Sequence, residues 1–315
     1  MKLIEAKVFI RHSKGVLVTS KFVFWPSLAG IIFLAAGVFN ARKDLGRAVG
    51  FYKLIALSCT LVAASLAVFG AEHLVDPPDL LPIVPAWIPL RLFWVYFVGI
   101  GLIAAAASLS FRRYVRFSAT LLAVMFFLFV LMIHIPNVAS HFRDRIFWAI
   151  ALRDLTFAGG ALALAGSQNR GWLLSRSGIF VNIARVCIGL PLLVFAIEHF
   201  LHPEFAPGVP LNKLTPGWVP LPMLWAYLSG IVLLAGGVGI LLNKHARAAA
   251  AWVGTLMTLL TLFLYFPILT MARGTSQTVV GINYVADTLL YGGAVLLLAQ
   301  ALRTNDPEKL ERDVT

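Results

Sequence analysis

The sequence predicts an all-α, polytopic membrane protein, with two tandem, parallel four-helix transmembrane bundles and one leading N-terminal helix. Of its 315 residues, 60% are hydrophobic and only 13% are charged, about half the charged share of a typical soluble domain. Apolar runs long enough to cross a bilayer, about 18 residues or more, recur along the chain. A phrase containing Glu-His, Pro, Trp-x-Pro and Trp-x-Tyr also occurs twice, in the same order.

We expect nine membrane spans, all of them helices. An isolated strand cannot satisfy its backbone groups in lipid, and the residue alternation of a membrane barrel is absent. An alternative with eight spans places the first apolar run in the interface or makes it re-enter. We favour nine because that run is long enough to cross. The expected spans are 22–39, 53–74, 90–110, 114–135, 146–166, 179–201, 222–242, 249–271 and 279–301.

The two copies of the phrase belong to a duplicated four-helix unit. The offset between copies is 126 residues at the Glu-His pair (198 less 72), 131 at the first Trp (218 less 87) and 133 at an Asp of the fourth helix (287 less 154). These shifts are insertions in loops, as expected of a genuine duplication. Because four is an even number, both copies enter and leave on the same side and are parallel. The matched pairs include Glu72-His73 with Glu198-His199, Trp87 with Trp218, Pro136 with Pro267 and Asp154 with Asp287.

This duplication divides the chain into five regions. Two of them are the four-helix units, which we call repeat 1 and repeat 2. The ending of the leading span resembles that of a fourth helix, as a remnant of an earlier copy would. The regions are 1–52 (basic tail and leading span), 53–166 (repeat 1), 167–178 (cytoplasmic linker), 179–301 (repeat 2) and 302–315 (charged cytoplasmic tail).

The distribution of Lys and Arg predicts the orientation. Most of them gather on one side, which is cytoplasmic by the positive-inside rule, so the C-terminus is cytoplasmic and the Glu-His loops face outward. The basic N-terminal tail then lies outside, against that rule. The gathering of Lys and Arg in cytoplasmic loops explains the net charge of +12, so we expect no nucleic-acid partner. The expected partner is a lipid bilayer, and the expected location is a membrane of the bacterial inner-membrane type. The basic side holds Arg42, Lys43, Arg47, Arg112, Arg113, Arg116, Arg170, Arg176, Lys244, Arg247, Arg303, Lys309 and Arg312.

Aromatic residues surround each outer turn. Amphipathic rings are favoured at the membrane–water interface, so an interface belt explains them as well as a role in supporting a site does. They are Trp87, Trp94, Tyr96, Trp218, Trp225 and Tyr227.

The acidic residues within the spans, unlike the aromatic residues, are not explained by the outer turn alone. Asp154 and Asp287 lie about eight residues, or roughly 12 Å, into their helices, where ionisable groups are costly and normally face the bundle interior. Glu72 and Glu198 approach from the same outer side. We therefore expect each repeat to gather its own carboxylate pair. His73 and His134 would join the pair of repeat 1, and His199 and Tyr265 that of repeat 2.

Three interpretations of these residues stay open. They form a structural network with Arg153 or indole N–H groups, or a small-ligand or proton site, or a metal site. The metal signal is weak, because His199-x-x-His202 has Asp76 at the second matching position of the other copy, and H-E-x-x-H is absent. No metal site is therefore predicted.

Arg185, in the sixth span, is a separate intramembrane charge, since Cys59 stands at the matching position of repeat 1. We expect it to pair with helix carbonyl groups or a carboxylate.

The pattern resembles the DoxX-like membrane proteins. The resemblance rests on the four-helix unit, the Glu-His end of its first helix, "VPAWIP" with "TPGWVP", "WVYFVG" with "WAYLSG", and Gly-Gly-Ala in the fourth helix. It implies a redox-associated membrane subunit that holds a lipophilic ligand such as a quinone near the outer face, together with a redox partner protein. The alternatives are a small-solute or ion transporter and a non-enzymatic scaffold. The catalytic residues, if any, stay unknown.

Overall fold

The computed structural model describes residues 16–50, 52–168, 176–208 and 212–302. Within these ranges, nine helices or helix series are long and apolar enough to cross a membrane, which confirms the all-α polytopic class and favours nine spans over eight. The helices are α2 (Val16–Arg47), α3 (Tyr52–Ala56), α4 (Ser58–Val75), α5 (Pro77–Leu80), η1 (Leu81–Ile83), α6 (Arg91–Phe111), α7 (Val115–Phe129), η2 (Val130–His134), α8 (Ile135–Ser140), α9 (Arg145–Ser167), α10 (Arg176–Leu201), α11 (Pro222–Leu241), α12 (Ala246–Leu260), η3 (Thr261–Tyr265), α13 (Phe266–Thr270) and α14 (Thr275–Ala301).

The third helix of each repeat contains one π-helical turn, η2 or η3, at matching positions. Pro136 and Pro267 follow these turns by two residues. Proline has no N–H, and its ring clashes with the carbonyl four residues earlier. A wider turn directly before the proline relieves this conflict while the helix continues. His134 and Tyr265 end the two π-turns.

The backbone repeats as well as the sequence. Six non-glycine residues adopt a left-handed conformation, with φ between 49° and 57°. They form three pairs, each at an offset of 131 residues (221 less 90), and two of the pairs have unlike side chains. Left-handed residues are rare outside glycine, so their recurrence at one spacing supports an internal duplication independently of residue identity. The pairs are Leu90 with Leu221, Arg112 with Asn243 and Tyr114 with His245.

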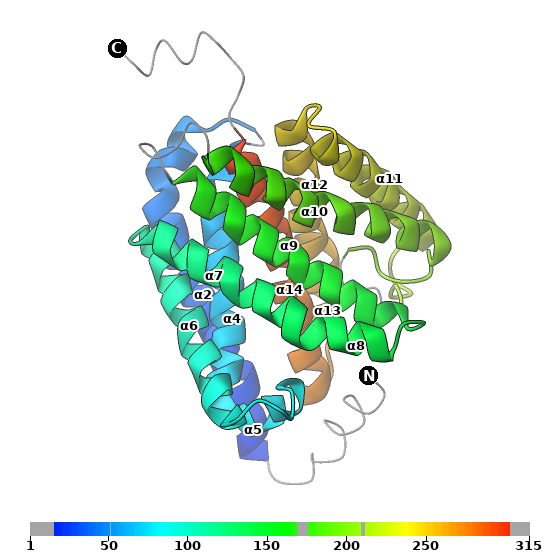
Figure 1. Ribbon diagram of the computed structural model, residues 1–315. Helices are drawn as coiled ribbons and strands as arrows, with labels where there is room; N and C mark the ends of the chain where they lie inside the picture. The colour runs from blue at the N-terminus through cyan, green and yellow to red at the C-terminus, as the bar shows by residue number, and fades with distance from the viewer. Residues whose placement is uncertain (1–15, 51, 169–175, 209–211, 303–315) are drawn as a thin grey trace.

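The helices of the two repeats interlock (Figure 1). Neighbouring helices form a ring in the order α4, α6, α7, α9, α10, α11, α12 and α14, and α14 closes the ring by packing on α4. The fourth helices of the two repeats, α9 and α14, also contact each other across the middle. The first helix of each repeat therefore packs against the fourth helix of the other.

The leading helix α2 packs against α4 and α6. In addition to α14, α2 is thus a second neighbour of the first helix of repeat 1. That α2 is a remnant fourth helix stays a prediction.

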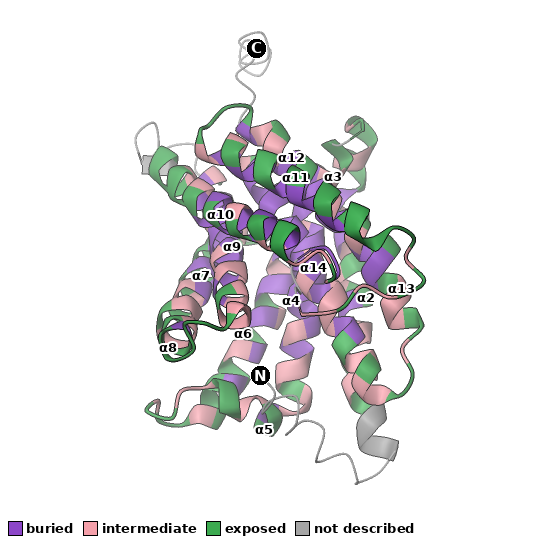
Figure 2. Ribbon diagram, turned by 90° about the vertical axis from the view of Figure 1, so that its right-hand side faces the viewer, coloured by how far each residue is buried: buried purple, intermediate pink, exposed green. Residues whose placement is uncertain are grey.

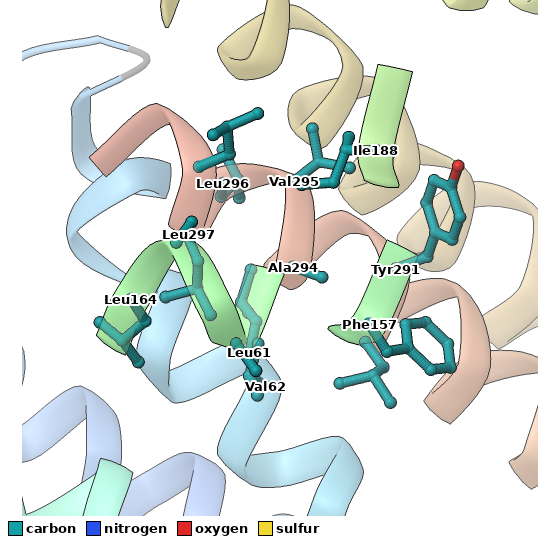
Figure 3. Packing of buried hydrophobic residues seen from close by; sticks show 14 of the residues in the cluster. Leu61, Val62, Phe157, Leu164, Ile188, Tyr291, Ala294, Val295, Leu296 and Leu297 are labelled. Carbon is teal, nitrogen blue, oxygen red and sulfur yellow. The ribbon is translucent and has the colours of Figure 1, made fainter. Parts of the chain in front are cut away.

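The most enclosed helices are α4 and α14, as the purple segments of Figure 2 show. In each, 72% of the most apolar 18-residue window is buried, against 17% for α2. A close approach of α9 and α14 makes this core possible, because a Cβ at Gly160 would lie only 2.7 Å from the Ala294 Cα. Small residues allow such contacts between membrane helices. Around the contact, large apolar side chains of α4, α9, α10 and α14 interdigitate (Figure 3).

Candidate functional site

A buried ionic network joins the two repeats at the contact of α9 with α14. Arg153 lies between two aspartates: one terminal guanidinium nitrogen donates to Asp287 Oδ2 at 2.7 Å, and Nε donates to Asp154 Oδ1 at 3.4 Å. His134 Nε2 lies 2.7 Å from the other Asp154 oxygen. Repeat 1 thus supplies the arginine, one aspartate and the histidine, and repeat 2 supplies the second aspartate.

Most of each side chain in this network is hidden. The side chains of His134, Arg153, Asp154 and Asp287 are 10% to 22% exposed. Asp154 is nine residues from the N-terminal end of α9 (154 less 145), or about 14 Å along the axis. Charges at this depth are costly unless paired, and removing one partner of a buried pair costs more than the pair contributes. The network therefore constrains how α7, α9 and α14 pack.

Glu72 of α4 also meets a residue of repeat 2. In the amide orientation that satisfies hydrogen bonding, the Asn283 nitrogen donates to both carboxylate oxygens of Glu72, at 2.5 and 3.1 Å. Asn283 precedes Asp287 by four residues on α14, so both project from one helix face. This spacing of four residues is the feature of the sequence from which Asn283 could have been predicted as a site residue.

The expected association of His134 with Asp154 within repeat 1 is confirmed, but the other acids find their partners across the repeats. Glu198 of repeat 2 accepts from Arg145 of repeat 1 at 3.1 Å, at the N-terminal end of α9. Repeat 1 contributes His134 and Asp154 to the shared network, whereas Glu72 bonds to α14. The reason is the interlocked order of the helices, which gives the first helix of each repeat a neighbour from the other.

The charges of the network do not balance without additional protons. Three carboxyl groups gather around a single permanent cation: Asp154 and Asp287 contact Arg153, and Glu72 bonds to Asn283, one helical turn from Asp287. His134 supplies a second positive charge only when it is protonated. Two protons, shared among the carboxyl groups and the imidazole, are therefore needed for these groups to be neutral, so the network can take up and release protons.

The histidines at the ends of the first helices share one backbone contact. Nδ1 of His73 lies 2.7 Å from the Phe69 carbonyl, and Nδ1 of His199 lies 2.6 Å from the Phe195 carbonyl. The other ring nitrogen of His199 accepts the Gly208 N–H at 2.9 Å. Both His199 nitrogens are thus used within the chain, so this residue holds the outer loop in place.

The six predicted aromatic residues are all exposed on the described surface. This exposure fits an interface belt and not a lining for the acids. The ring that does approach the network belongs to Phe157, which lies 5.7 Å from the Arg153 guanidinium carbon.

Arg185 donates to the Ile240 and Leu241 carbonyls, each at 2.9 Å, which confirms its predicted pairing with helix carbonyls. It completes the open C-terminal end of α11.

No group of three or more His, Cys, Asp or Glu side chains within the described ranges has the geometry of a metal site. His202, the second residue of the weak metal motif, instead lies 3.5 Å from Glu204.

Comparison with known proteins identifies one region. A family model described as a domain of unknown function (DUF8561) matches residues 62–156, which run from α4 into α9 and include Glu72, His134, Arg153 and Asp154. No curated protein and no solved structure matches the chain. The resemblance to DoxX-like proteins stays a prediction.

Proposed function

We propose that this integral membrane protein binds a small lipophilic molecule that exchanges protons with the network of Glu72, His134, Arg153, Asp154 and Asp287. A quinone is the ligand class that the DoxX-like resemblance favours. The observation that carries the proposal is the excess of carboxyl groups over permanent cations at membrane depth. Carboxyl groups in excess of cations can hold protons that a ligand receives or returns, and ionisable residues at this depth commonly belong to proton pathways.

The residues of the network fit the polar ends of a quinone. A quinone carbonyl accepts a hydrogen bond and a quinol hydroxyl donates one; imidazole and carboxyl groups can meet both needs. When bound, such a ligand would supply two-electron redox chemistry. The protein would orient its head group and hold the exchanged proton at His134 or Asp154, which lie within hydrogen-bond distance of each other.

Ligand retention tests the proposal. The protein is purified in a mild detergent, its lipids are extracted, and bound quinone is quantified by mass spectrometry. We expect a stoichiometric quinone in the parent and a loss of most of it in Asp154→Asn and in Asp287→Asn. Glu204→Gln is the matched control, because Glu204 is an exposed acid of the outer loop. Absence of quinone from the parent, or full retention in both aspartate variants, would overturn the proposal and leave a scaffold.

The matched π-turns favour a second candidate, a proton-coupled transporter. Single π-turns inside α-helices are frequent at functional sites, and here each one ends at a polar residue, His134 or Tyr265, whose side chain makes a hydrogen-bond contact with another element. This candidate predicts solute uptake into proteoliposomes that a proton gradient drives and that Asp154→Asn abolishes. Equal uptake in proteoliposomes and in protein-free liposomes would exclude the transporter.

A further inference from the structure

The outer end of repeat 2 is closed by its own chain. After α10, the segment Ala206–Gly208, which we call the plug, folds inward and is buried. Its Pro207 carbonyl accepts the Tyr265 hydroxyl at 2.7 Å, and its Gly208 N–H donates to His199 Nε2 at 2.9 Å. One peptide group of the plug therefore bridges the first helix and the π-turn of this repeat.

Repeat 1 has the same pair of features, a histidine at the end of the first helix and a π-turn in the third, which we call the frame. It has no plug. His73 occupies the position of His199 and makes the same bond to the carbonyl four residues earlier. His134 stands where repeat 2 has Tyr265, at the end of the matching π-turn. The connection after the first helix is five residues shorter in repeat 1, as the change of offset from 126 to 131 shows. Its short helix α5 packs on α4 and α6.

Exposure differs at every matched position around this frame. In repeat 2, the four positions are buried, at 6% exposure or less. In repeat 1, all four are only half-buried. The same frame is thus covered in one repeat and accessible in the other. The pairs, repeat 2 first, are Phe195 and Phe69, His199 and His73, Leu264 and Ile133, and Tyr265 and His134.

From this difference we infer that repeat 1 holds the ligand's head group between His73 and His134, in the place that the Pro207–Gly208 peptide group fills in repeat 2. The inference rests on the proposed function and narrows its ligand class. A peptide group presents a hydrogen-bond donor directly beside an acceptor. The ligand presents the same pair, as a fatty amide does, or a quinol whose hydroxyl stands beside a methoxy oxygen.

The polar atoms of repeat 1 match this assignment. His73 Nε2, the counterpart of the nitrogen that accepts from Gly208, has no hydrogen-bond partner among the described residues, and neither has His134 Nδ1. The donor of the ligand lies against His73 and its acceptor against His134. His134 Nδ1 donates to that acceptor when Asp154 is protonated and donates to Nε2, or when both ring nitrogens carry a proton. Because His134 Nε2 contacts Asp154, this placement connects the head group directly to the shared network.

Thiol labelling tests whether repeat 1 is open. Cys59 and Cys187 are replaced by serine, and single cysteines are compared in matched pairs: His73→Cys with His199→Cys, and Ile133→Cys with Leu264→Cys. The second pair leaves both histidines intact, so loss of the Gly208 bond cannot loosen the plug in it. We expect a small maleimide to label the repeat 1 cysteine several-fold faster in both pairs. Equal rates, or faster labelling in repeat 2, would overturn the inference.

Binding tests the ligand class separately. We expect decanamide and decylubiquinol each to slow labelling of Ile133→Cys, which keeps both histidines, and the further change His73→Ala to weaken their binding about tenfold, as loss of one hydrogen bond does. His199→Ala should leave binding unchanged. If repeat 1 is open but neither probe slows labelling, the donor–acceptor assignment is wrong, whereas quinone retention that depends on Asp154 would still support the proposed function.

Discussion

Repeats 1 and 2 share one backbone arrangement around the end of the first helix, but they satisfy its polar atoms in different ways. Both end their first helix with a histidine bonded to the preceding turn, and both contain a π-turn before a proline. In repeat 2, the chain supplies the missing partners through the plug. In repeat 1, His134 turns to a buried carboxylate instead. The two repeats thus share this backbone arrangement but fill it differently, and the inferred ligand site belongs to repeat 1 alone.

The largest expected loss of stability comes from removing the shared cation of the ionic network. Arg153→Met leaves Asp154 and Asp287 without their shared cation, and breaking a buried pair by removing one partner costs about 3–5 kcal/mol. Unfolding in detergent, followed by circular dichroism, should show this loss of stability. Adding Asp154→Asn and Asp287→Asn to the variant should restore much of it. Parental stability in Arg153→Met alone would contradict the role of the network.

The contact between the fourth helices is the next most sensitive feature. In Gly160→Ala, the new methyl group meets backbone atoms of Ala294 at 2.7 Å, so α9 and α14 must separate. Overpacking of this kind typically costs about 1–3 kcal/mol. Gly101→Ala on α6 is the control, since a Cβ there meets nothing within 4 Å. Equal melting temperatures for both variants would show that the close approach is not required.

The plug contributes less, because its contacts are neutral hydrogen bonds. Tyr265→Phe leaves the Pro207 carbonyl without its donor and should destabilise the protein by about 1 kcal/mol. It should also raise the labelling rate of Leu264→Cys, since the plug then opens more often. Tyr227→Phe, on the exposed surface, should change neither value. An unchanged labelling rate in Tyr265→Phe would mean that the tyrosine does not hold the plug closed.

The smallest expected effect on stability is that of replacing Glu198, which lies near the end of the first helix of repeat 2 as Glu72 does in repeat 1. Glu198 pairs with Arg145 near the outer surface, where both side chains are about one-fifth to one-quarter exposed, so Glu198→Gln should cost at most about 1 kcal/mol. It should also leave quinone retention intact. Glu72→Gln, in contrast, should reduce retention, because Glu72 bonds to Asn283, one helical turn from Asp287 on α14. Equal retention in both variants would remove Glu72 from the site.

Local patterns in the sequence predicted the membrane class, the nine spans and the depth of the aspartates. Hydrophobic run length fixes where a helix can cross, and helix rise fixes how far Asp154 lies from the outer end. The repeat was visible because Glu-His, Trp-x-Pro and Asp recur in order. These features require no knowledge of which helices touch.

The partners of the acids could not be predicted, because they depend on the order of the helices. Nothing near Glu72 in the sequence indicates that α4 lies beside α14, or that Glu198 meets Arg145 of the other repeat. That order depends on contacts between distant helices, such as the close approach of Gly160 to Ala294. The burial of His199 depends on a loop whose inward fold has no periodic signal. Both are outcomes of tertiary packing.

A double-mutant cycle between Arg153 and Asp287 tests the central claim most directly, since these residues join the two repeats. Arg153→Met, Asp287→Asn and the combined variant are compared with the parent by the free energy of unfolding. A shared buried ion pair predicts a coupling energy of about 1.5 kcal/mol or more, with the double variant more stable than the sum of the single losses allows. Additive losses, with a coupling below about 0.3 kcal/mol, would show that the repeats do not share one network.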